Sequence, residues 1–239
     1  MSGIVGENPA SVDQGRSEIR ERASGQRKIV GLARIAAAGL IFAAIITQIV
    51  DQLVNNAFVA DEYFSYFTIE SSFINVVVLG VGGVLAFRWL RDPELYTAVR
   101  MSAVAYAVVT GAVYNVLLRG LPPTGFVGIQ WPNEVMHVWI PIFILLDWIL
   151  SPGRARLGWK RLLFAVSFPV AWCIYTLVRG SVDGWYPYPF INPTLDGGYP
   201  SVIAYIVGLS AFIVGLAAAL IAISRFGARR APATGVTPS

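Results

Sequence analysis

Long apolar segments alternate with short polar ones along this chain. A transmembrane helix needs about 20 mostly apolar residues, and six windows are of that order. These windows are Val30–Val50, Phe64–Phe87, Ala98–Leu118, Asn133–Leu150, Arg161–Val178 and Pro200–Ser224. The pattern predicts an all-α, polytopic membrane protein with six transmembrane helices. Residues 30–225 would form the membrane domain, and the polar segments 1–29 and 226–239 are expected to be disordered cytoplasmic tails.

The composition agrees with a bilayer environment. Hydrophobic residues make up 56% of the chain and charged residues 13%, whereas soluble domains carry about 25% charged residues. The formal net charge is +4, but the basic residues lie beside the apolar windows and form no stripe on a soluble surface. We therefore expect membrane lipids, and not nucleic acid, as the partner of these charges.

Lysine and arginine concentrate in alternate loops, which predicts the orientation of the chain. Both tails and the second and fourth loops are basic, the second loop through Arg88, Arg91 and Arg100. The first, third and fifth loops hold only Arg119 and Arg179. Both termini should therefore be cytoplasmic, with the protein in the cell membrane and the odd-numbered loops outside.

Polar residues in the second window recur on one helical face. Thr68, Ser71, Ser72 and Asn75 follow the spacing i, i+3, i+4 and i+7, whereas Glu70 falls on another face. Such residues often pack one transmembrane helix against another. Polar groups at membrane depth also mark functional interiors, so the spacing leaves both interpretations open.

The fourth window contains Glu134 and His137, one helical turn apart. His137 is the only histidine, which excludes a multi-histidine metal site and a haem held by two histidines, and we expect no cofactor. Acid–base chemistry or a plain hydrogen bond remains for His137, while Glu134 suits the positive end of the helix dipole. In the predicted orientation, His137 and Thr68 both lie about 6 Å below the outer surface.

Asp147 and Trp148 end the fourth window. Asp147 lies about 15 Å along the helix from His137, too far to orient its ring, and is expected to pair with a basic loop residue near the inner interface. Trp148 suits an aromatic anchor at that interface.

The fifth loop, Asp183–Pro200, is dense in proline and aromatic residues, among them Tyr188. Proline limits its freedom and aromatic rings suit a membrane interface. A lid over the mouth of the bundle and a rigid linker with aromatic anchors both explain this composition.

Three segments together resemble the androgen-induced membrane protein family. They are Tyr66-Phe67-Thr68-Ile69, then Asn133-Glu134-Val135-Met136-His137 followed by Pro141–Leu145, and finally Gly184-Trp185 with Tyr188-Pro189-Phe190. The chain is most similar to the bacterial six-span branch, through Phe64–Ile69 and Asp147-Trp148. The resemblance extends from about Gly31 to Arg225.

This resemblance implies a threonine hydrolase of fatty acid esters of hydroxy fatty acids. Thr68 would be the nucleophile and His137 its general base, with a lipid ester or fatty acid as substrate. The residues that flank both motifs differ from those in the animal members of the family, so the resemblance does not identify the substrate of this protein. Residues at the same outer end are expected to contact the substrate: Ser72, Asn75, Tyr114, Asn115, Glu134, Tyr175, Arg179 and Tyr188.

Ester hydrolysis also requires donors for the developing oxyanion. Asn75, Tyr114, Asn115 and Tyr175 are candidates, and the sequence does not choose among them. Two other functions remain open: a transporter, although no internal repeat is visible, and a non-catalytic lipid-binding or regulatory protein on the same fold. The distance between Thr68 and His137 in the folded chain would discriminate this non-catalytic protein from a hydrolase. The sequence does not indicate the oligomeric state.

Overall fold

The computed structural model describes residues 25–122 and 125–227. In these residues the chain forms helices and no strands. Six helices are long and apolar enough to span a membrane, which confirms the predicted fold class and fits a multi-pass membrane protein. The expectation that both tails are disordered falls mostly outside the described residues.

The helices follow the predicted order. The first four are α2 (Gly25–Val54), the short α3 (Ala60–Tyr63), α4 (Phe67–Arg88) and α5 (Glu94–Val113). A π-helical segment, η1 (Tyr114–Leu118), continues α5. The fourth span is composite, with α6 (Trp131–Glu134), the π-helical η2 (Val135–Trp139) and α7 (Ile140–Leu150). The remaining helices are η3 (Trp159–Arg161), α8 (Leu162–Asp183), η4 (Pro189–Ile191) and α9 (Gly198–Gly227).

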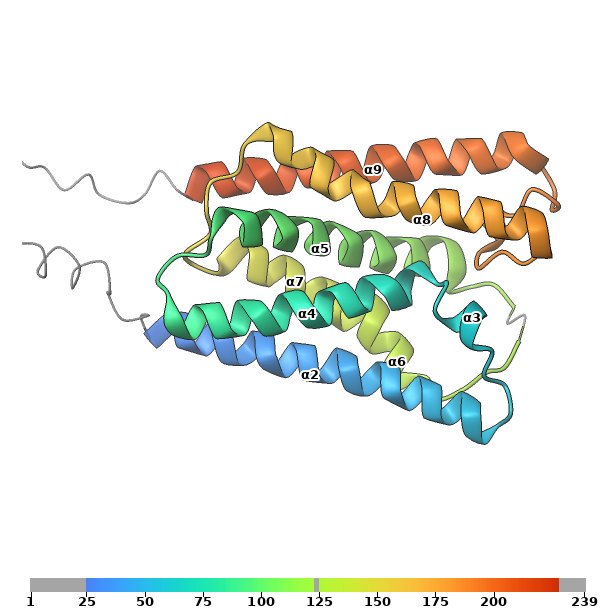
Figure 1. The fold of residues 1–239 in the computed structure, drawn as a ribbon, viewed down its shortest axis with the longest axis horizontal. Helices are drawn as coiled ribbons and strands as arrows, with labels where there is room; N and C mark the ends of the chain where they lie inside the picture. The colour runs from blue at the N-terminus through green and yellow to red at the C-terminus, as the bar shows by residue number, and fades with distance from the viewer. Residues whose placement is uncertain (1–24, 123–124, 228–239) are drawn as a thin grey trace, which may run out of the picture.

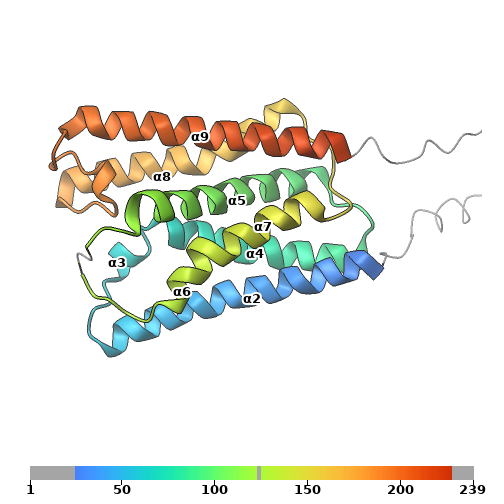
Figure 2. The same ribbon diagram turned by 180° about the vertical axis from the view of Figure 1, so that it is seen from behind.

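Helix α5 is the centre of the bundle. It contacts α4, α7, α8 and α9, and Figures 1 and 2 show α8 and α9 side by side along one side of it. Small residues let transmembrane helices approach closely, and four alanines of α5 are buried: Ala98, Ala103, Ala105 and Ala107. A similar approach joins α2 to α4, where a Cβ on Gly31 would come within 2.9 Å of the Gly83 carbonyl oxygen.

The start of α2 and the end of α9 lie at the same end of the bundle (Figure 1), as an even number of spans requires. We call this the terminal end. Helix α3, η1 and α6 lie at the opposite end, which we call the site end. That the terminal end faces the cytoplasm stays a prediction.

Five charged residues are buried together at the terminal end. This arginine–aspartate cluster consists of Arg27, Arg34, Asp92, Arg100 and Asp147, each with a side chain at most 5% exposed. Arg34 Nε donates to both carboxylate oxygens of Asp147 at 3.0 and 3.2 Å, and Arg100 Nη2 donates to Asp147 at 2.5 Å. Arg27 Nη2 donates to Asp92 at 2.6 Å. The cluster ties α2, α5, α7 and the α4–α5 loop together.

The cluster explains two differences from the sequence-based expectations. The partners of Asp147 lie in helices and not in loops, because α5 begins at Glu94 and so contains Arg100, while Arg34 lies within α2. Trp148 is fully buried and is not an interfacial anchor. The guanidinium groups of Arg100 and Arg154 lie 5.2 and 5.5 Å from its ring centre, so its ring packs against the cluster.

Candidate active site

Thr68 lies in the first turn of α4. Tyr66 precedes the helix in an extended conformation, and no side chain caps the helix N-terminus. The face predicted from the sequence points inward, since Thr68, Ser71, Ser72 and Asn75 are each at most 8% exposed. Backbone N–H groups in a first helical turn have no partner within the helix. Thr68 therefore combines a buried hydroxyl with the positive end of a helix dipole.

The Thr68 hydroxyl pairs with the only histidine. Thr68 Oγ1 lies 3.2 Å from His137 Nε2, and the other ring nitrogen, Nδ1, lies 2.9 Å from the main-chain carbonyl oxygen of Asn133. A carbonyl oxygen only accepts hydrogen bonds, so in the neutral ring Nδ1 carries the proton. Nε2 then presents its lone pair to the Thr68 hydroxyl, as a general base requires.

The two π-helical segments hold the histidine in place. Pro141 has no N–H, so the carbonyl of His137, four residues earlier, receives no α-helical hydrogen bond from it. Asn115 Nδ2 in η1 donates to that carbonyl at 3.1 Å and to the Gly111 carbonyl at 2.8 Å. A Cβ on Gly111 would lie 2.9 Å from the same His137 oxygen, so glycine is needed for α5 to approach this closely. π-Helical turns occur frequently at functional sites.

Tyr114 covers one face of the imidazole. The two rings are stacked, with centroids 4.1 Å apart and planes inclined by 27°. Asn133 Nδ2 donates to the Tyr114 hydroxyl at 2.5 Å. The Arg119 guanidinium lies 5.4 Å from the centre of the Tyr114 ring and pairs with Glu134 at the surface. These contacts restrict the rotation of His137.

The loop between α8 and α9 brings Tyr188 to the same place. Its hydroxyl oxygen lies 3.5 Å from both Thr68 Oγ1 and Thr68 N. The ring packs against Tyr66, Trp172 and Phe190, with centroid distances of 5.2 to 5.9 Å. Burial raises the pKa of Tyr188 to about 12, so the hydroxyl keeps its proton at neutral pH. This geometry favours the lid over the rigid linker as the interpretation of the loop.

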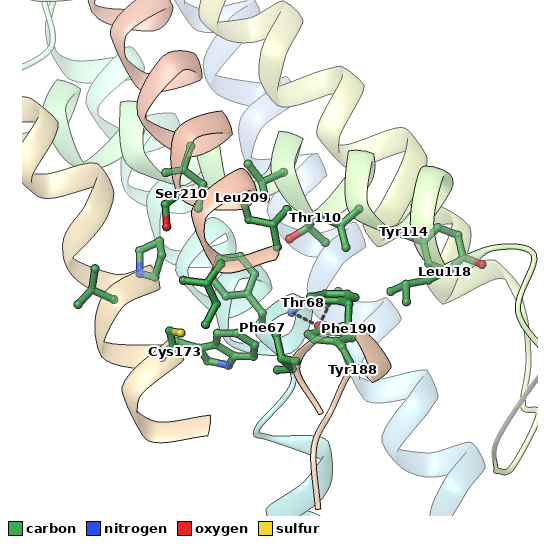
Figure 3. Close-up of a pocket in the computed structure, with 18 of the residues that line it drawn as sticks. Phe67, Thr68, Thr110, Tyr114, Leu118, Cys173, Tyr188, Phe190, Leu209 and Ser210 are labelled. Atoms are coloured by element: carbon green, nitrogen blue, oxygen red, sulfur yellow. Dashed lines mark hydrogen bonds between the residues drawn. The ribbon is translucent and has the colours of Figure 1, made fainter. Parts of the chain in front are cut away.

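Thr68, His137 and Tyr188 open onto a cavity of about 310 Å³. Its other walls are mostly aliphatic and aromatic side chains from α5, α8 and α9. Figure 3 shows Thr68 beside Tyr188 and Phe190, with Leu209 and Ser210 of α9 further along. Thr110 also lines it, and the Thr110 hydroxyl is buried without a hydrogen-bond partner among the described residues. A cavity of this kind suits an apolar chain with few polar atoms.

The predicted site residues divide into three groups. Four line the cavity: Thr68, Tyr114, His137 and Tyr188. Asn115 and Glu134 do not line the cavity but contact residues close to it. Asn115 donates a hydrogen bond to the His137 carbonyl, and Glu134 forms a surface ion pair with Arg119. The others lie outside the cavity lining: Ser72, Asn75, Tyr175 and Arg179.

The residues outside the lining have other partners. Asn75 Nδ2 donates to the Ser71 carbonyl at 2.9 Å, deeper along α4. The Tyr175 hydroxyl lies 2.8 Å from Ser65 Oγ, and Arg179 binds Asp61 and Ser65. The face of α8 that carries Tyr175 and Arg179 thus fastens α8 to the α3–α4 segment.

Two features of the site were not predicted from the sequence, the Asn133 carbonyl behind His137 and the role of Pro141. Proline four residues after a histidine in a helix is a signal for a carbonyl that needs another donor, and Asn115 supplies it. The assembled group contains a hydroxyl, a base with a fixed tautomer and a neutral donor, which are the parts of an acyl-transfer site. No protein-family model, curated protein or solved structure matches this chain.

Proposed function

We propose that this protein is an intramembrane hydrolase of lipid carboxylic esters, with Thr68 as nucleophile and His137 as general base. One observation carries the proposal. Thr68 Oγ1 lies 3.2 Å from His137 Nε2, while Nδ1 is engaged by the Asn133 carbonyl. A nucleophile, its base and a third group that orients the base are the diagnostic arrangement for covalent catalysis by a hydroxyl.

The reaction proceeds in two half-reactions. Thr68 Oγ1 attacks the ester carbonyl carbon and its proton passes to His137 Nε2. The tetrahedral adduct then expels the alkoxide of the leaving alcohol, which takes the proton from Nε2 and leaves an acyl-threonine. In the second half, water attacks the acyl-threonine and gives its proton to Nε2. Collapse of that adduct releases the fatty acid, and the proton returns to Thr68.

The apolar walls of the cavity support a fatty acyl chain as the group that binds beside Thr68. The resemblance to the androgen-induced family adds fatty acid esters of hydroxy fatty acids as the ester class. In the predicted orientation the site lies close to the outer membrane surface, where both a lipid from the bilayer and water have access. A site in the cell membrane with these properties would act on lipids that are already dissolved in the bilayer.

The test is hydrolysis by the purified protein in detergent, measured with a panel of lipid esters that includes fatty acid esters of hydroxy fatty acids. The wild type should release fatty acid, and Thr68→Ala should not. A fluorophosphonate probe should label Thr68, and the label should be lost in His137→Ala, whose hydroxyl lacks its base.

A matched control is Thr176→Ala, which removes the same atoms from a buried threonine that lies outside the cavity lining. It should keep wild-type activity. Full hydrolysis by a folded Thr68→Ala protein would reject the nucleophile. Stoichiometric lipid binding by the wild type without any ester turnover would instead favour the non-catalytic lipid-binding function.

A further inference from the structure

The Tyr188 hydroxyl and the Thr68 amide face one another beside the nucleophilic oxygen. Tyr188 Oη lies 3.5 Å from Thr68 Oγ1 and 3.5 Å from Thr68 N, and the N–H is directed at the hydroxyl oxygen. In the same helical turn, the N–H groups of Ile69 and Glu70 donate to the Tyr66 carbonyl. The Thr68 amide is thus held near the nucleophile by the helix that also carries its side chain.

A carbonyl oxygen attacked by Thr68 would lie two bonds from Oγ1. Donors that stabilise the resulting oxyanion lie about 2.7–3.1 Å from it. A hydroxyl group 3.5 Å from Oγ1, on the side where the cavity begins, is within that reach. The amide at the N-terminus of α4 adds the positive end of the helix dipole at the same point.

We infer that the Tyr188 hydroxyl and the Thr68 backbone N–H form the oxyanion hole, an assignment that rests on the proposed hydrolase function. When Thr68 Oγ1 bonds to the carbonyl carbon, the π electrons of the carbonyl move to its oxygen. Both groups donate hydrogen bonds to that oxygen without transferring a proton. When the adduct collapses, the electrons return to the carbonyl bond and the alkoxide leaves.

The four residues that the sequence suggested as donors have other partners. Asn75 donates to Ser71, and Asn115 donates to the Gly111 and His137 carbonyls. The Tyr114 hydroxyl accepts a hydrogen bond from Asn133 Nδ2, and the ring that carries it is stacked on His137. The Tyr175 hydroxyl lies 2.8 Å from Ser65 Oγ. In the described part of the chain, Tyr188 is the residue whose hydroxyl contacts both atoms of Thr68.

The Tyr188 ring is also held before substrate binds. It is stacked on Phe190 with an interplanar angle of 4°, and Tyr66 meets it edge-on. Donors that are fixed in advance need no reorganisation during the reaction, which is why such electrostatic stabilisation is effective. Because the pKa of Tyr188 is raised to about 12 by burial, the hydroxyl stays a donor throughout the neutral range.

The test is Tyr188→Phe, which removes one oxygen and keeps the ring. Loss of one oxyanion donor costs about 10²–10³-fold in kcat, and we expect that decrease with KM little changed. Tyr186→Phe is the matched control from the same loop, because the Tyr186 ring packs on Gly180 and lies outside the cavity lining. It should keep wild-type kcat.

A second measurement separates catalysis from loop structure. A fatty acyl trifluoromethyl ketone forms a tetrahedral adduct with an oxyanion, whereas a fatty ether of the same length does not. Tyr188→Phe should weaken binding of the ketone by about the factor lost in kcat/KM, and should leave binding of the ether unchanged. Equal weakening of both ligands would make Tyr188 a structural residue and overturn the assignment.

The two proposals fail in different ways. If the wild type hydrolyses esters and Tyr188→Phe has wild-type kcat, the oxyanion hole is wrong and the hydrolase stands. If the wild type shows neither turnover nor fluorophosphonate labelling at Thr68, the hydrolase is wrong and the oxyanion hole with it. Thermal unfolding of each purified variant in detergent should match that of the wild type. If Tyr188→Phe unfolds at a lower temperature, Tyr188→Trp takes its place, since it likewise removes the hydroxyl and retains an aromatic ring.

Discussion

Two buried polar groups lie at opposite ends of the same bundle and use their polarity differently. At the terminal end, the carboxylates of Asp92 and Asp147 are ion-paired to arginines, and none of the five cluster residues lines the cavity. At the site end, Thr68 and His137 form one hydrogen bond of 3.2 Å and open onto the cavity. Burial of polar groups alone therefore does not distinguish a structural cluster from a candidate active site.

The difference lies in how the polar atoms are satisfied. Asp147 pairs with both Arg34 and Arg100, and removing this carboxylate would leave their buried positive charge largely uncompensated. The Thr68–His137 pair is neutral and keeps a reactive oxygen at the cavity wall. Ionisable residues inside membranes are generally functional candidates, yet here the charged cluster fastens helices and the neutral pair carries the chemistry that we propose.

The largest expected effect comes from removing both members of the Thr–His pair. Thr68→Ala and His137→Ala should each lower kcat by about 10⁴-fold or more, and the double variant should be little worse than either, because residues that act as one unit are strongly non-additive. Hydrolysis assays on the three purified proteins measure this. Multiplicative losses would mean that the two residues act independently. Thr68→Ser, which retains the hydroxyl, should keep part of the activity.

Substitutions in the arginine–aspartate cluster should instead lower the stability of the fold. Asp147→Asn removes the charge that compensates Arg34 and Arg100, and breaking a buried ion pair in this way costs about 3–5 kcal/mol. Thermal unfolding in detergent should show a large decrease. Glu134→Gln is the control, since its pair with Arg119 is surface-exposed and such pairs contribute about 0–1 kcal/mol. Similar losses in the two variants would remove the contrast between the ends of the bundle.

The smallest effect concerns the far wall of the cavity. Ile213 lies one turn beyond Leu209 along α9 and also lines the cavity. Ile213→Trp should fill that part of it, so that kcat/KM falls by about tenfold for long acyl chains and less for short ones, the scale of a few methylene contacts. A chain-length series of esters measures this. An equal loss for all lengths would indicate a general distortion of the bundle.

Sequence reasoning was most successful where a pattern extends over a whole helix. The six apolar windows correspond to the six long helices, because the bilayer demands a minimum apolar length. The polar face of α4 is buried as its spacing indicated. The predicted directions of the second and fourth spans gave the depth of each residue along the bundle. Thr68 and His137 were therefore expected at the same depth, and in the structure they are in contact.

The remaining features depend on contacts between helices. Arg34 lies in a predominantly apolar window and is distant in sequence from Asp147. The pattern therefore predicted a loop residue, and not Arg34, as the basic partner of Asp147. Arg100 was counted with the second loop, although the predicted window Ala98–Leu118 contains it, and in the structure it lies in α5. Side-chain direction decided the rest: Tyr175 and Cys173 are near neighbours on α8, but only Cys173 faces the cavity.

The position of Tyr188 in the α8–α9 loop links access to reactivity. The same segment walls the cavity and supplies a hydroxyl to Thr68, so a loop displaced far enough to admit a bulky lipid also separates the nucleophile from that hydroxyl. In the proposed hydrolase, cleavage would then require the loop to return over the bound acyl chain. A hydrolase built in this way would be immersed in the esters of the surrounding bilayer without degrading them indiscriminately, because passing contact with Thr68 is not sufficient for turnover.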